Sequence, residues 1–353
     1  MRVLVTGGTG FVGSHSVAAL MRAGHDVRLL VRRADRIAPA LEPLGITAPM
    51  DHIVGDVTDP EPVARAVAGC DAVLHAAAVY NLDARASRAT TETNLPGTQI
   101  VLDAAVAEGC DPIVHVSSTV ALTRRGTTVT PDSPLSNLRS PYIASKAASE
   151  QYARSLQDWG APIVIVQPGG VYGPHDPHLS DQMRRLKDVL KGRYPMWPTG
   201  GYHVVDVRDV AAVHAAVMVV GQGPRRYIVP GDHTHGRRLF GALRAVTGRR
   251  LPFLTVPSVL MLPITWSVSK IQPFVPFHIP ADHEGVLINH NVTRCDDSRA
   301  RSEVGVVPRS LEDSLRDSVR WLHEHGHVSV RQAGLTAGDL TGPSGRSPRD
   351  GGR

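Results

Sequence analysis

The sequence predicts an α/β protein: a doubly wound parallel sheet with a smaller C-terminal α+β substrate lobe. Three observations support this. Short apolar runs alternate with longer helix-like segments through the first half of the chain, the first run leads into a glycine-rich turn, and the length of 353 residues exceeds the roughly 250 to 300 residues over which one hydrophobic core usually grows. We therefore expect one large domain and a smaller appendage.

Six apolar runs are expected to form strands. They are nearly continuous in hydrophobic character, which is typical of strands buried on both faces of a parallel sheet. Helix-like segments separate them, so each strand would connect to the next by a right-handed crossover. The strands are predicted at residues 3–5, 27–31, 52–54, 72–75, 113–116 and 163–166, and the helices at 12–23, 61–69, 93–108 and 140–159.

The pattern becomes less regular after Pro168. We expect the first domain to span residues 1–170, with a strand returned to it from about 203–206, and the second lobe to span 171–330. Another strand is predicted at 226–229. Apolar residues at helical spacing predict a last helix over 311–324. The tail over 331–353 is poor in apolar residues and is predicted to be disordered.

Composition excludes several classes of protein. The chain is 42% hydrophobic and 20% charged, which rules out disordered and collagen-like proteins. Its net charge of +5 comes from scattered arginines, and aromatic residues make up only 5%, so nucleic-acid binding is not expected. Three widely spaced cysteines and an N-terminus without a signal peptide predict reduced thiols in the cytoplasm.

Residues 251–269 carry no charge. Three prolines would interrupt a membrane-spanning helix there. We expect a buried or pocket-covering segment of the second lobe. The alternative is a weak contact with a membrane surface.

The turn after the first strand has the composition of a phosphate-binding loop. Gly7, Gly10 and Gly13 permit a tight turn, the approach of the backbone to a pyrophosphate, and close packing of helix on strand. The helix that begins near Phe11 and Val12 would direct its first N–H groups at the anion. A dinucleotide site is therefore predicted in the first domain.

The GxxGxxG spacing resembles the short-chain dehydrogenase/reductase superfamily, whose members have a Rossmann fold. Arg32 and Arg33 follow the second strand where NAD-using relatives place a carboxylate, and guanidinium groups suit a 2′-phosphate. The expected cofactor is NADP(H), with NAD(H) as the alternative. The resemblance also implies contacts of the cofactor with the turn at Asp56 and Val57, and with the small residues Ala76, Ala77 and Ala78.

Tyr142 and Lys146 stand four residues apart in a predicted helix, which places both on one face. A phenol with its ordinary pKa near 10 is a poor acid at neutral pH, and a neighbouring ammonium and a cationic nicotinamide would lower that pKa. The family resemblance implies that Tyr142 is the acid–base residue. It implies that Lys146 modulates the Tyr142 pKa and binds the cofactor ribose.

Hydroxyl residues end the fifth predicted strand, at the edge where open α/β sheets bind ligands. Ser118 is the expected hydrogen-bond donor to the substrate oxygen, and Thr119 is the alternative. After the sixth strand, residues 167–174 resemble the "RPxxVYGP" segment of the extended branch of the superfamily. Gln167 replaces the usual Arg, so only backbone contacts of the loop with the cofactor are implied, through Pro168, Gly169 and Val171.

Asn94 matches a helix motif of the extended branch and is expected to fix local geometry rather than to catalyse. Residues 203–210 resemble its "hVxDva" segment, which is expected to be structural. Within the branch, the chain looks most like the dihydroflavonol reductase-like and 3β-hydroxysteroid dehydrogenase-like members. An NADP(H)-dependent oxidoreductase for a small, apolar or alicyclic alcohol or carbonyl is expected, as a cytoplasmic protein and a plausible homodimer. A nucleotide-sugar epimerase or dehydratase with bound NAD and a non-catalytic NADP(H)-binding protein are the alternatives.

Two groups of histidines stand out, and the first of them, at residues 323–327, is not expected to bind metal. Residues 323–327 contain three histidines and a glutamate, but no second cluster completes a tetrahedral set. His175, Asp176 and His178 follow the 167–174 loop and are expected in a solvated loop, with a place in the substrate cleft as the alternative.

Overall fold

The structure is a computed structural model and describes residues 1–79, 87–274, 282–291 and 293–335. Its centre is a seven-stranded sheet in the order β11-β7-β5-β4-β1-β2-β3, and every pair in it is parallel. This confirms the doubly wound α/β fold. The strands are β1 (Arg2–Thr6), β2 (Asp26–Val31), β3 (Asp51–Val54), β4 (Ala72–His75), β5 (Ile113–Val116), β7 (Ile163–Gln167) and β11 (Arg225–Ile228).

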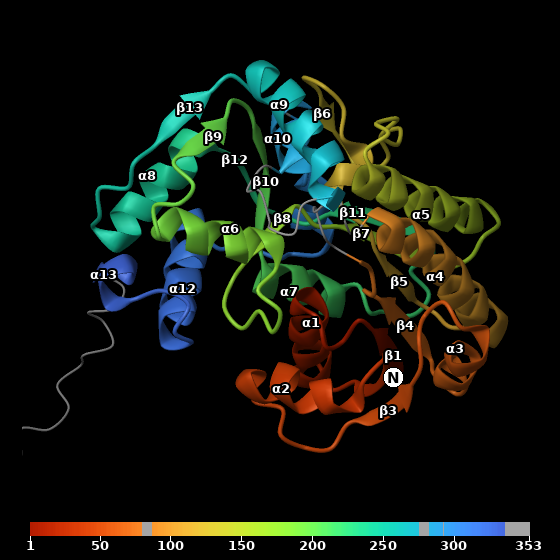
Figure 1. Cartoon of the computed structure of the whole chain (residues 1–353). Helices are drawn as coiled ribbons and strands as arrows, with labels where there is room; N and C mark the ends of the chain where they lie inside the picture. Colours follow the sequence, from red (N-terminus) through yellow and green to blue (C-terminus); the bar gives the residue numbers. More distant parts are fainter. Residues whose placement is uncertain (80–86, 275–281, 292, 336–353) are drawn as a thin grey trace, which may run out of the picture.

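Helices cover both faces of this sheet (Figure 1). Two buried clusters hold them there. The first joins one face of the sheet to α1 (Phe11–Arg22), α7 (Val207–Ala216) and α11 (Ser298–Glu303). The second joins the opposite face to α3 (Pro60–Val67), α4 (Ser87–Glu108) and α5 (Pro141–Asp158). The central strands are buried on both sides, which explains their continuous apolar sequences.

The second lobe has its own core around Trp197, Phe240 and Leu315. A three-stranded sheet in the order β12-β10-β8 and the pair β13-β9 form its strands. They are β8 (Gly170–Tyr172), β9 (Met196–Pro198), β10 (Gly201–Asp206), β12 (Asp232–His235) and β13 (Leu254–Val256). Its helices are α6 (Asp181–Leu190), α8 (Gly236–Thr247), α9 (Ser258–Ile271), α10 (His283–Asn291) and α12 (Leu311–Glu324). The short pair β6 (Thr128–Val129) and β14 (Arg294–Cys295) and the short helix α2 (Ile37–Leu41) complete the fold.

The expected return of residues 203–206 to the central sheet is wrong. The returning strand is β11, which pairs with β7 from Arg225–Val164 to Ile228–Gln167. Residues 203–206 belong to β10, which pairs with β8 and β12 in the smaller sheet. Residues 203–206 are all buried and include Val204 and Val205, whereas β11 reads Arg-Arg-Tyr-Ile and its first two residues are only partly buried, so the hydrophobic pattern favoured the wrong segment.

The predicted start of the tail at residue 331 also needs correction. Residues Val330–Ala333 form the short helix α13, and Ser329 and Gln332 make a capping box at its start. Ala333 is fully buried in the second lobe's core. The rest of the predicted tail, 336–353, lies outside the described residues.

The charge-free segment 251–269 forms β13 and most of α9, and it is not buried as expected. Val259, Leu260, Ile264 and Trp266 are each more than half exposed, because α9 packs on the lobe through its other side. No helix in the described ranges is both long and apolar enough to span a bilayer.

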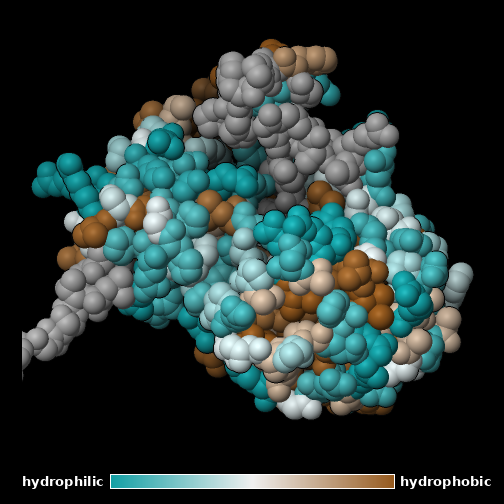
Figure 2. Space-filling view, turned by 60° about the horizontal axis from the view of Figure 1, so that its bottom comes forward, coloured by the Kyte–Doolittle hydropathy of each residue, from teal (hydrophilic) through white to brown (hydrophobic). Residues whose placement is uncertain are grey.

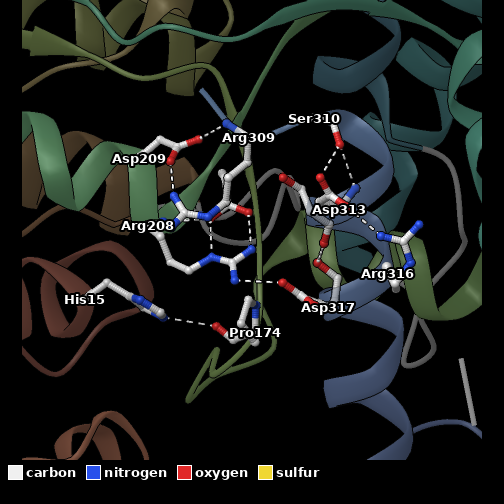
Figure 3. A network of polar contacts seen from close by, with 12 residues as sticks. His15, Pro174, Arg208, Asp209, Arg309, Ser310, Asp313, Arg316 and Asp317 are labelled. Carbon is white, nitrogen blue, oxygen red and sulfur yellow. Dashed lines mark hydrogen bonds and ion pairs between the residues drawn. The ribbon is translucent and has the colours of Figure 1, made fainter. Parts of the chain in front are cut away.

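Ion pairs fasten the two lobes together (Figure 3). Arg208, at the start of α7, donates to Asp206 at 2.8 Å and to Asp317 of α12 at 2.7 Å. Arg309, just before α12, pairs with Asp209, which is almost completely buried. Partly buried, bidentate ion pairs lose much more when one partner is removed than exposed pairs do, so α12 is held firmly against the first domain.

Candidate active site

The ends of four neighbouring strands meet at the carboxyl edge of the central sheet, where open α/β folds bind ligands. The glycine turn follows β1, Ala76 follows β4, Ser117 follows β5 and Pro168 follows β7. Backbone hydrogen bonds continue the sheet into these ends, since Ala76 N–H donates to Thr6 O and Ser117 N–H to Val166 O. The predicted glycine turn, small-residue stretch and Pro168 loop are therefore brought together.

The glycine turn is too crowded for larger residues. Gly7 has a φ of 74°, and a Cβ there would lie 2.7 Å from Ala77 N. A Cβ on Gly13 would lie 2.0 Å from Gly7 O. No acidic side chain occupies the first turn of α1, so its N–H groups and positive dipole end suit an anion. These residues fit the pyrophosphate of a nicotinamide dinucleotide.

Gly13→Ala is expected to lower the free energy of unfolding by about 3 kcal/mol or more, because the new methyl group would overlap backbone rather than a movable side chain. Gly241→Ala is the matched control. It is also a helical glycine but has nothing within 4 Å of its added Cβ, so it should be neutral or slightly stabilising. Urea unfolding of the two variants measures the difference, and equal stabilities would contradict this explanation of Gly13.

The predicted adenosine-side residues lie along the same edge, after β2 and β3. Arg32 and Arg33 are both exposed. Arg33 Nε donates to Asp35 at 3.0 Å, whereas Arg32 has no hydrogen bond or ion pair with any described residue. Val57 contacts α4, since a Cβ on Gly97 would lie 2.8 Å from its Cγ2. Asp56 accepts hydrogen bonds from Thr58.

Tyr142 and Lys146 project from the first turns of α5 towards the end of β5. The Tyr142 phenol lies near Ser118, close enough for the serine side chain to affect its pKa, and Lys146 Nζ donates to Val116 O at 3.2 Å. Ser118 also donates to Pro168 O at 3.2 Å. All three side chains are buried, each less than 10% exposed. Phenol, ammonium and hydroxyl thus converge beside the Pro168 loop, while Thr119 begins the next helical turn.

The expected lowering of the phenol pKa is not found in the protein itself. Burial raises the pKa of Tyr142 above its ordinary value, the nearby Glu284 carboxylate raises it further, and the neighbouring Ser118 side chain opposes them. Burial lowers the pKa of Lys146 to about 8, partly offset by Glu150. The phenol therefore stays protonated at neutral pH in this environment, as a proton donor must.

A fully buried carboxylate supports the site from behind. Glu150 accepts hydrogen bonds from Ser117 at 2.5 Å, from Gln167 at 2.7 Å and from Arg154 at 2.6 Å. Gln167, which replaces the usual Arg of the loop, therefore ties the end of β7 to α5. This network fixes the strand ends relative to the helix that carries Tyr142 and Lys146.

Asn94 has the structural role that was expected of it. Its side chain accepts from Val79 N–H at 2.7 Å and donates to Ser145 Oγ at 3.1 Å, which joins α4, the loop after β4 and α5. A residue that the sequence did not indicate, His75, bonds Thr6 Oγ1 at 2.8 Å and Thr98 Oγ1 at 3.3 Å. Through these bonds, His75 links β4 to β1 and α4, and Asn94 links α4 to the loop after β4 and to α5.

The profile of the NAD dependent epimerase/dehydratase family matches residues 3–229. The chain belongs to this family. Its members include the extended short-chain dehydrogenases/reductases that the motifs resembled. The family is nicotinamide-dependent, which agrees with the crowded glycine turn and the strand ends around it.

Similar proteins of the family carry different names. A protein of Synechocystis sp., provisionally named dihydroflavonol 4-reductase, is 32% identical over 341 residues, covering 93% of this chain and 96% of the relative. A 3-beta-hydroxysteroid dehydrogenase of Mycolicibacterium neoaurum is 30% identical over 335 residues, covering 87% of each. The structure of the dTDP-glucose 4,6-dehydratase DesIV of Streptomyces venezuelae, with NAD and TYD bound, has a TM-score of 0.71 and 27% identity, covering 92% of this chain and 97% of that one.

Not every predicted residue of this epimerase/dehydratase family member points towards the strand ends. The Phe11 side chain packs into the core of the second lobe, and Val171 lies in β8, paired with Val205. Ala78 is exposed. His175 is partly buried and lies 6.4 Å from the His15 ring, and Asp176 is buried, so the segment is less solvated than expected.

Glu284 is the site residue that sequence reasoning missed. It extends from α10 in the second lobe, and its Oε1 accepts the Tyr142 backbone N–H at 3.0 Å. Its Oε2 is buried without a hydrogen-bond partner among the described residues. Burial raises the pKa of this carboxyl to about 7. A single glutamate 142 residues away from Tyr142 carries no motif that could have indicated it.

The ionisation of Glu284 is expected to make the stability of this family member pH-dependent. Its pKa is raised to about 7 in the fold, so the folded chain holds a proton that the unfolded chain loses above about pH 4.5. The stabilisation is complete below that pH and is lost as pH rises to 7. Relative to Glu284→Gln, the native chain should lose about 3 kcal/mol of unfolding free energy between pH 4.5 and 7.

Urea unfolding of both chains across this pH range measures the difference between them, in which all other ionisable groups cancel. Parallel pH profiles would show that Glu284 is not buried as a protonated carboxyl.

Proposed function

We propose that the chain is an NADP(H)-dependent oxidoreductase that interconverts an alcohol with a ketone or aldehyde. The observation that carries the proposal is the convergence of the buried Tyr142, Ser118 and Lys146 side chains at the carboxyl edge of the nicotinamide-family sheet. Two hydroxyls and an ammonium at this edge are what the polarisation and protonation of a carbonyl oxygen require.

The bound dinucleotide supplies a hydride to the carbonyl carbon or takes one from the alcohol carbon. The protein residues handle the oxygen. Ser118 donates a hydrogen bond to it, and Tyr142 gives it a proton as negative charge develops there. Lys146 holds a cation on the same face of α5 and would bind the ribose. Burial of all three side chains excludes water, which strengthens their electrostatic effect.

The preference for NADP(H) is supported by Arg32. This arginine follows β2, is exposed and has no ion pair among the described residues, so its guanidinium is free to bind a 2′-phosphate. Arg33 is already paired with Asp35. We assign the main phosphate contact to Arg32 for this reason.

The substrate class is proposed to be a small apolar or alicyclic carbonyl compound or alcohol. Two of the similar proteins bear names that refer to a flavonoid and to a steroid. α10 of the second lobe reaches the site through Glu284, which accepts the Tyr142 backbone N–H. We propose that substrates bind between this helix and the Tyr142 hydroxyl.

The test is a screen for oxidation of NADPH and NADH at 340 nm with ketones, aldehydes, sterols and flavonoid-like compounds. Consumption of NADPH in proportion to alcohol formed is expected. The competing function is that of the NAD-bound dehydratase DesIV. Release of NAD on denaturation, together with conversion of a nucleotide sugar without net cofactor consumption, would overturn the proposal.

A further inference from the structure

The outward face of α9 is apolar. Eight of its residues are exposed, and at 100° per residue they occupy one continuous arc of about 160° on the helix. Six of the eight are apolar, and the other two are a serine and a lysine: Val259, Leu260, Pro263, Ile264, Trp266, Ser267, Lys270 and Ile271. A surface helix of a soluble domain normally turns its polar side outward. α9 instead turns its apolar side outward.

The inward face of α9 is held by polar contacts to α10. Ser258 Oγ lies 2.9 Å from His290 Nδ1, and Thr265 Oγ1 lies 3.0 Å from His283 Nδ1. Both Ser258 and Thr265 are buried. These bonds fix the rotation of the helix, so its apolar side cannot turn inward without breaking them. Folding therefore does not explain the apolar composition of the outward face.

Neighbouring residues extend this face. Leu254 of β13, Met196 of β9 and Phe274 beyond α9 are exposed by 59%, 51% and 87%. Figure 1 shows α9, β9 and β13 together at one end of the second lobe, and Figure 2 shows apolar atoms along the rim of that end. Contiguous exposed apolar surfaces of this kind mark sites of interaction.

The charges on and near this face distinguish between a lipid surface and a second copy of the chain as its partner. The sequence has no Asp or Glu between Arg250 and Asp282. Lys270 Nζ lies 5.7 Å from the centre of the Trp266 ring, and tryptophan beside a cation is typical of the boundary between lipid headgroups and acyl chains. A symmetric contact between two copies would bring Lys270 of each towards a face with no carboxylate, which disfavours a dimer here.

We infer that α9 docks the protein on the surface of a lipid bilayer that contains anionic lipids. The helix has 14 residues and contains Pro263, so it would lie in the plane of the headgroups rather than cross the bilayer. α10, the helix that is hydrogen-bonded to α9, also contains Glu284, which accepts a hydrogen bond from the Tyr142 backbone. The membrane would therefore lie on the side of the molecule from which α10 reaches the active site.

The test uses the full chain and vesicles of phosphatidylcholine, with and without phosphatidylglycerol. Co-sedimentation is expected, and it should be stronger with the anionic lipid. Trp266→Glu should lower the bound fraction about tenfold or more, since it replaces a large apolar contact with a charge of the wrong sign. Trp159→Glu is the matched control, because Trp159 is 84% exposed at the end of α5 and should leave binding unchanged.

Fluorescence locates the contact independently. Trp197 and Trp321 are buried, so Trp159→Phe leaves Trp266 as the exposed tryptophan, and Trp266→Phe leaves Trp159. Brominated lipids should quench the first variant and not the second. Absence of vesicle binding would overturn the inference, as would binding that Trp266→Glu leaves unchanged. Self-association that Trp266→Glu abolishes, without vesicle binding, would assign the face to a second copy. None of these measurements depends on turnover, so they stand apart from the proposed reaction.

Discussion

Replacing Tyr142 with Phe is expected to lower kcat about a thousandfold, the usual contribution of a positioned proton donor. The ring is buried and its hydroxyl lies near Ser118, so Phe fills the same space and removes only the proton-bearing oxygen. The Kd for NADPH should change by no more than about twofold, because the glycine turn and the arginines are untouched. Steady-state kinetics and fluorescence titration with NADPH measure the two quantities.

Tyr152→Phe is the matched control for this variant. Tyr152 lies on the same helix, but its hydroxyl bonds Asp103 of α4, away from the strand ends. The kcat of the Tyr152→Phe variant should stay close to that of the native chain. A Tyr142→Phe enzyme that keeps a tenth or more of the native turnover would contradict the assignment of Tyr142 as the proton donor.

Replacing Arg32 with Asp is expected to lower kcat/KM for NADPH about a hundredfold, which corresponds to the loss of one strong charge-assisted contact to a phosphate. The value for NADH should be unchanged or higher, because an acidic side chain at this position suits the ribose 2′-hydroxyl. The ratio of the two values, measured with one carbonyl substrate, is the readout.

Two arginines serve as comparisons. Arg33→Asp should have the smaller effect, since Asp35 already pairs with Arg33. Arg65→Asp, an exposed residue in the last turn of α3, should leave the ratio unchanged. If Arg32→Asp lowered kcat/KM for both cofactors equally, Arg32 would not be a determinant of the 2′-phosphate preference.

Much of the fold could be predicted, because the strands of a parallel sheet have a strong local signal. The six predicted strands and the helix carrying Tyr142 agree with β1 to β5, β7 and α5 to within about two residues. Long-range choices could not be predicted. Whether residues 203–206 or 225–228 border β7 depends on contacts far apart in sequence, and the segment that does so, 225–228, is the less buried of the two.

The orientation of α9 shows a second limit of the sequence. An uncharged segment was expected to be buried, but composition does not say which side of a helix packs. The side that packs here is chosen by hydrogen bonds of Ser258 and Thr265 to two histidines of α10. Polar residues that bond across an interface can therefore turn apolar ones outward.

The candidate site was predictable where its residues belong to one local pattern. The spacing of Tyr142 and Lys146 and the position of Ser118 at a strand end were enough to bring them together. Glu284 and Glu150 were not predictable, because each acts through partners in other elements: Glu284 through the Tyr142 backbone and Glu150 through Ser117 and Gln167. Single carboxylates in helices usually face solvent, so nothing in their surroundings marked them.

The position of β11 decides how this chain can be recombined with its relatives. Residues 225–228 complete the large sheet although they come after β8 to β10 of the smaller lobe. A chimera joined at residue 170 would therefore inherit its outermost large-sheet strand from the donor of the other half, and β7 would meet a foreign neighbour along its whole length. Exchange of substrate lobes needs at least two junctions, with 225–228 kept alongside the recipient's own β7.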